Sequence, residues 1–135
     1  MQNGTDRSAA AARLIERIVA ADERLDARAF VEVLTPAASF AFAGNPPVVG
    51  RDAVRGAVEN LFANLAALEH TIHASWESEA MLVYEAEVAY TFRSGANLRV
   101  PYVNVLRLDG ESVADYRIYL DPSTLNAILA GGAAG

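Results

Sequence analysis

The chain contains no cysteine, and this absence excludes several kinds of site. Without thiols there is no disulfide framework, no thiolate nucleophile and no cysteine-based zinc or iron–sulfur centre. A chain without cysteine is compatible with a reducing compartment. We therefore expect a cytoplasmic protein.

Positive charge is also scarce. The chain has 11 Lys and Arg against 17 Asp and Glu, which gives a net charge of −6 and a pI near 4.8. Such a surface repels both a phosphate backbone and an anionic membrane, so we expect no nucleic-acid partner and no membrane partner. No run approaches the ~20 apolar residues that span a bilayer, and the N-terminus lacks a basic segment followed by an apolar one. These features predict a soluble protein that is not exported.

Several enzyme motifs are missing as well. There is no Ser-His-Asp arrangement, no Gly-rich phosphate loop and no dinucleotide fingerprint. His70 and His73 are three residues apart in a predicted strand, which sends them to opposite faces, and no carboxylate cluster accompanies them. We therefore expect neither a metal site nor a cofactor. One of the two could act as a base in a pocket, although a lone histidine is more often structural.

Apolar residues, in contrast, are plentiful. The chain has 135 residues, 53% of them hydrophobic, which is enough for the core of one domain. We place that domain at residues 8–130. The polar stretch 1–7 and the Gly/Ala tail 131–135 cannot bury enough apolar area to offset their ordering entropy, so we expect flexible ends.

The apolar spacing changes along the chain. A helical period predicts helices over 8–25 and 54–65, with a short helix between them that Asp26 caps and Pro36 stops. A short strand over 39–43 and a Pro-rich loop separate the second and third helices. From about residue 69 the period is two, which predicts strands at 70–77, 81–93, 97–108 and 112–121. The expected fold is α+β, with helices on one face of an antiparallel meander.

Strand alternation predicts which sheet face is buried. The even positions of strand 81–93 are apolar, and Asn104 is the one amide in the matching row of strand 97–108. Val103 and Val105 lie on the opposite face. They indicate either a homodimer interface on the outer face of the sheet or ordinary surface exposure.

The order of elements and two segments, Pro101 to Arg107 and Asp115 to Pro122, resemble the SnoaL-like polyketide cyclase branch of the nuclear transport factor 2-like superfamily. The resemblance covers roughly residues 8 to 130. It implies a cone-shaped curved sheet of cystatin-like topology, mixed or antiparallel, with about three N-terminal helices on its concave face. It also implies frequent homodimers and a pocket used for isomerisation, ring closure, epoxide hydrolysis or binding alone. A shared fold does not choose among these activities.

Three residues are candidate catalytic groups. A buried amide needs partners, so Asn104 suggests either a donor to a ligand or a side chain satisfied by backbone. In similar ketosteroid isomerases this position carries an acid that stabilises an oxyanion. Asp121 matches the polyketide cyclases' general acid/base, although it would also serve as an ordinary cap. Glu87 matches an acid of similar epoxide hydrolases, whereas strand alternation turns it outward.

Other candidate positions are aromatic or aliphatic. The ketosteroid isomerase base falls near Phe42 and the third hydrolase acid near Ile118, and neither side chain moves a proton, which disfavours both activities. Core packing explains these residues equally well. We expect the pocket to be lined by Phe42, Phe62, His73, Tyr90, Tyr102, Tyr116, Ile118 and Leu120.

Together these features predict a pocket protein that binds a small apolar molecule. It would transform this molecule by acid–base chemistry of the isomerase or cyclase type, with Asp121 as acid/base and Asn104 as polarising donor. The alternative is a ligand-binding or dimerisation module without catalysis.

Overall fold

The computed structural model describes the backbone of residues 2–134 and the side chains of residues 9–130. The expected flexibility of the ends, 1–7 and 131–135, concerns residues whose side chains lie outside this description. It stays a prediction.

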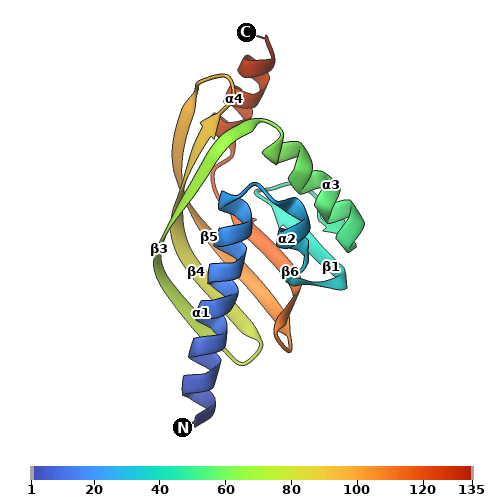
Figure 1. The fold of residues 1–135 in the computed structure, drawn as a ribbon, viewed down its shortest axis with the longest axis vertical. Helices are drawn as coiled ribbons and strands as arrows, with labels where there is room; N and C mark the ends of the chain where they lie inside the picture. Colours follow the sequence, from blue (N-terminus) through green and yellow to red (C-terminus); the bar gives the residue numbers. More distant parts are fainter. Residues whose placement is uncertain (1, 135) are drawn as a thin grey trace.

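Helices cover one side of a curved sheet (Figure 1). They are α1 (Gln2–Glu23), α2 (Ala27–Val31) and α3 (Arg51–Phe62), and α4 (Ser123–Ala134) follows the last strand. The strands are β1 (Leu34–Phe42), β2 (Val48–Val49), β3 (Leu65–Ser78), β4 (Met81–Phe92), β5 (Asn97–Asp109) and β6 (Ser112–Tyr119). None of the described helices is long and apolar enough to cross a membrane.

The sheet is mixed, in the order β2-β1-β6-β5-β4-β3. Strands β3 to β6 form the predicted antiparallel meander, and β1 adds to β6 in parallel. The α+β class and the three helices on the concave side are confirmed. The fourth helix and the two-residue strand β2 are additional to the prediction.

Pro36 does not end the short helix as predicted. The helix ends at Val31, and Pro36 lies inside β1. The pairing of β1 with β6 shifts register between Leu34 and Ser39. The proline therefore occupies an irregular stretch in which the strand pairing does not require the backbone N–H that proline lacks.

The core lies between the helices and the inner face of the sheet. The even positions of β4, from Leu82 to Phe92, are all buried, as strand alternation predicts. They meet buried residues of the amphipathic helices, such as Ile18 of α1 and Val54 of α3. Towards one end of the cone this packing leaves a cavity.

Candidate functional site

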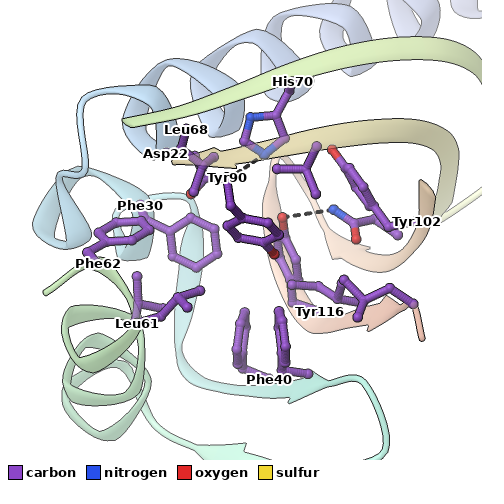
Figure 2. A pocket seen from close by; sticks show the side chains of 16 residues that line it. Asp22, Phe30, Phe40, Leu61, Phe62, Leu68, His70, Tyr90, Tyr102 and Tyr116 are labelled. Carbon is purple, nitrogen blue, oxygen red and sulfur yellow. Dashed lines mark hydrogen bonds and ion pairs between the residues drawn. The ribbon is translucent and has the colours of Figure 1, made fainter. Parts of the chain in front are cut away.

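The cavity has walls from almost every element of the fold. Phe30 of α2, Phe40 of β1 and Phe62 of α3 form much of its apolar lining. In Figure 2, His70 and Asp22 lie in the upper part of the view, Phe30 and Phe62 at the left and Phe40 at the bottom. The volume open to the centres of water molecules is about 60 Å³. A water needs about 10–15 Å³ by this measure, so several waters or part of a small organic molecule fit.

Asp22 reaches the cavity from the last turn of α1. The helix ends in a Schellman motif, because Leu25 is left-handed (φ 54°) and the Asp26 N–H donates to the Ala21 carbonyl at 2.9 Å. This closure fixes Asp22 where the helix dipole disfavours negative charge. An acid in this position conflicts with local helix electrostatics, and such conflicts are typical of functional sites.

His70 meets Asp22 from strand β3. Its Nε2 lies 3.5 Å from an Asp22 carboxylate oxygen, and the two side chains are 7% and 16% exposed. The His70 backbone N–H donates to Glu23 Oε2 at 2.8 Å, which joins the end of α1 to β3. His70 Nδ1 is buried without a hydrogen bond, at 3.8 Å from the same Glu23 oxygen.

Burial shifts the two groups in opposite directions. Desolvation, followed by the nearby Glu23 charge, raises the pKa of Asp22 from 3.8 to about 8. Desolvation also lowers the pKa of His70 from 6.5 to about 4, against the opposing effect of Glu23. Between these values a neutral carboxylic acid stands beside a neutral imidazole. The acidic proton of the pair is on the Asp22 carboxyl, and the imidazole of His70 beside it is free to act as a base.

Asn104 lies on the cavity wall with 2% of its surface exposed. Its Nδ2 donates to the hydroxyls of Tyr84 at 2.8 Å and Tyr116 at 3.1 Å. Its Oδ1 is buried and has no hydrogen-bond partner in the described part of the chain. The amide is thus held by tyrosine side chains rather than by backbone.

The tyrosines of this region stay protonated. Burial, the largest cause, raises the pKa of Tyr84 to about 12, despite opposing hydrogen bonds with Tyr116 and Asn104. Burial also raises the pKa of Tyr90, Tyr102 and Tyr116. These phenols are therefore neutral hydrogen-bonding groups over the physiological range.

Most of the predicted pocket residues lie where the sequence places them. Besides Asn104, the cavity wall includes Phe42, Phe62, Tyr90, Tyr102, Tyr116, Ile118 and Leu120. Their contact with a ligand stays a prediction. His73 is a correction, because it is exposed and His70 takes the inward position. The pairing of His70 with the buried Val88 places His70 on the inner face, so His73, three residues further along the strand, lies on the outer face.

The two predicted acids lie outside the cavity wall. Asp121 is exposed and accepts hydrogen bonds from the Ser123 N–H at 3.0 Å and hydroxyl at 2.8 Å, at the start of α4. These bonds lower its pKa, the opposite of what proton transfer near neutrality requires. Glu87 lies on the outer face of β4 and forms an ion pair with Arg99 at 3.0 Å. Strand alternation, not the gap-free match to the hydrolases, gave the correct side.

The sequence carried one signal for Asp22. It falls four residues after Ile18, so it continues the buried stripe of α1 that begins with Leu14. A carboxylate in an apolar stripe needs an explanation. Nothing in the linear sequence shows that His70 supplies it.

A second hollow adjoins the cavity. It is lined by residues of α3 and α4, including Leu125 and Leu129, and shares Phe40, Phe42 and Leu61 with the cavity wall. The apolar end of the cavity thus continues beneath α4. Among the described side chains, no cluster of three or more His, Asp or Glu could hold a metal ion.

Several solved structures share this fold. A candidate SnoaL-like polyketide cyclase from Jannaschia sp. CCS1 superposes with a TM-score of 0.76 at 18% identity, over 87% of this chain and 90% of that one. An NTF2-like protein of unknown function from Burkholderia pseudomallei K96243 gives 0.77 at 15% identity, over 86% and 94%. An LEH-like epoxide hydrolase from M. tuberculosis gives 0.74 at 17% identity, over 93% of each chain.

At these identities the structural likeness shows the fold alone. Among curated proteins, none is significantly similar in sequence. The model of the SnoaL-like domain family, however, matches residues 15–116, which is well over half of the chain. The chain therefore belongs to the SnoaL-like domain family.

Proposed function

We propose that this protein is an enzyme that transfers protons within a small, mostly apolar molecule, in the manner of an isomerase or cyclase, without a cofactor. The observation that carries the proposal is the Asp22–His70 pair, with its 3.5 Å separation on the wall of an apolar cavity. Perturbed acids and bases in a cleft are typical of catalytic sites.

The pair has the chemistry for enolisation. His70 Nε2 takes a proton from a carbon next to a carbonyl, and the Asp22 carboxyl gives its proton to the carbonyl oxygen. The substrate becomes the enol, and the pair becomes aspartate and imidazolium. Proton transfer between the two side chains restores both neutral groups, so the pair needs no external acid to reset.

Deuterium exchange tests this function. In D₂O, NMR follows deuterium uptake at the carbons next to the carbonyl of cyclohexanone or 2-tetralone. The wild type is expected to accelerate exchange, and His70→Gln or Asp22→Asn to lose on the order of 100-fold or more. His73→Gln, on the same strand but exposed, is the matched control and should keep the wild-type rate.

Two outcomes would contradict this assignment. Loss of exchange in Asp121→Asn, with His70→Gln unaffected, would return the catalytic role to Asp121. Ketone binding without acceleration in the wild type would favour the alternative, a ligand-binding module. The small cavity volume, about 60 Å³, favours the other form of the alternative, a dimerisation module whose cavity is largely filled by its own side chains.

Homodimerisation through the outer sheet face is part of the proposal. The strand register aligns Trp76, Val83 and Val105 across three strands. Trp76 is 56% exposed, and Tyr119, which pairs with Val103, is 49% exposed. Apolar side chains gathered on one face support burial against a second copy. A cytoplasmic location also belongs to the proposal, and cell fractionation checks it.

A further inference from the structure

Glu23, the last residue of α1, lies beside the Asp22–His70 pair. One of its carboxylate oxygens, Oε2, accepts a hydrogen bond from the His70 backbone N–H at 2.8 Å. The same oxygen lies 3.8 Å from His70 Nδ1, while the other ring nitrogen, Nε2, lies 3.5 Å from an oxygen of Asp22. The imidazole therefore stands between two carboxyl groups, one at each of its nitrogens.

The two carboxyl groups differ in what they offer the ring. The protonated carboxyl of Asp22 can donate to a bare nitrogen or accept from an N–H, so it does not decide which nitrogen carries the proton. The Glu23 side chain is 38% exposed and negatively charged, and a carboxylate only accepts. Nδ1 is buried and has no hydrogen-bond partner among the described residues, so the charge of Glu23 favours a proton on this nitrogen.

The same charge acts on Asp22. Desolvation is the main cause of the raised pKa of Asp22, and the charge of Glu23 adds to it. From β5, the ring of Tyr102 meets the imidazole edge-on, with the ring centroids 5.9 Å apart, and burial keeps this phenol protonated and neutral. One negative charge at the end of α1 thus favours a protonated Asp22 together with an unprotonated Nε2 on His70.

We propose that Glu23 is a positioning residue for the base of the reaction, because it holds His70 in the tautomer that carries its proton on Nδ1. Nε2, the nitrogen beside Asp22, is then the one that accepts a proton from the substrate. The imidazolium that forms lies next to the Glu23 carboxylate, and the opposite charges stabilise it. This role rests on the proposed function, because it concerns the base of that reaction.

The tautomer can be measured in the wild-type protein without a substrate. Two-bond ¹H–¹⁵N correlation spectra distinguish a protonated from an unprotonated imidazole nitrogen. At about pH 6 both members of the pair are neutral, since their pKa values are about 4 and about 8. We expect His70 to show a protonated Nδ1 and an unprotonated Nε2. The reverse tautomer, or an even mixture, would overturn the inference even if no variant folds.

Glu23→Gln separates the charge from the contact between α1 and β3. The amide oxygen can still accept from the His70 backbone N–H, but the amide N–H can also donate to Nδ1, so both tautomers become accessible. We expect a mixture of tautomers and roughly tenfold slower deuterium exchange of 2-tetralone. Glu16→Gln, at an exposed glutamate of the same helix, is the matched control and should keep the wild-type tautomer and rate.

The outcomes separate this inference from the proposed function. A Glu23→Gln variant with the wild-type tautomer and exchange rate would refute the inference, because Glu23 would then only join α1 to β3. Accelerated exchange by a wild type that holds His70 in the reverse tautomer would refute the inference alone. A protonated Nδ1 in a wild type that does not accelerate exchange would refute the proposed function, while the tautomer assignment would stand.

Discussion

Replacing Asp22 by asparagine is expected to change the direction in which stability depends on pH. The pKa of Asp22 is raised from 3.8 to about 8 in the folded protein. Its stabilising contribution is therefore complete below pH 3.8 and is lost as the pH rises through about 8. The pKa of His70 is lowered from 6.5 to about 4, so its contribution is complete above pH 6.5 and is lost as the pH falls through about 4.

The two contributions cancel over part of the range. Between pH 4 and 6.5 the folded pair binds one proton, on Asp22, and the unfolded pair also binds one, on His70. The pair then adds no slope to the stability curve. From pH 6.5 to 8 only the folded pair keeps its proton, so stability falls by about 1.4 kcal/mol per unit, or about 2 kcal/mol in total.

In Asp22→Asn, His70 is the only member of the pair that still titrates. Desolvation, the main cause of the His70 shift, remains in the variant. Stability should then rise by about 3 kcal/mol from pH 4 to 6.5 and stay flat to pH 8. As the pH rises from 4 to 8, the contribution of the pair to stability is flat and then falls in the wild type, whereas in the variant it rises and then levels off.

Urea unfolding followed by circular dichroism, at half-unit steps of pH, measures these curves. The difference between variant and wild type isolates the pair from the other titrating groups. Asp52→Asn, an exposed aspartate in the first turn of α3, is the control and should keep the wild-type shape. Parallel curves for Asp22→Asn and wild type would refute the reasoning, because they would mean that Asp22 titrates alike in both states.

Three further predictions concern the frame around the site. Leu125→Ala removes a side chain of α4 that is 1% exposed and should cost about 2–4 kcal/mol in urea unfolding; a change below 0.5 kcal/mol would show that α4 is not packed as described. Glu79→Gly should stabilise by about 0.5–1 kcal/mol, since Glu79 is exposed at φ 53°, and any loss of stability would contradict that conformation. Light scattering at micromolar concentration should show a dimer that Val105→Lys dissociates, whereas a wild-type monomer would reject the outer-face interface.

Strand alternation made much of the sheet predictable. In β4 each even residue is buried, and the odd residues Glu85 and Glu87 lie on the outer face. A side-chain period of two assigns faces without knowledge of the partner strand. Alternation did not predict the start of β1. A proline normally ends regular structure, whereas Pro36 lies in an irregular stretch of β1, between the paired residues Leu34 and Ser39.

The residues of the candidate site also divide into those that local sequence predicts and those that it does not. Asn104 was recognisable because an amide in an apolar row stands out, whatever its neighbours are. His70 was not, because alternation places the two histidines on opposite faces, and only the pairing of β3 with β4 shows which of them faces inward. Asp121 was misplaced because a match of sequence position does not reveal that its carboxylate caps α4.

Sequence alone determined the α+β class, the buried face of the meander, the aromatic wall of the cavity and the polar exception at Asn104. These depend on local spacing, which the chain carries with it. Only the tertiary structure brought Asp22 to His70, since these residues are 48 positions apart and meet through the closure of α1 over β3. Their opposite pKa shifts arise from burial and neighbouring charge, and both exist only once the chain has folded.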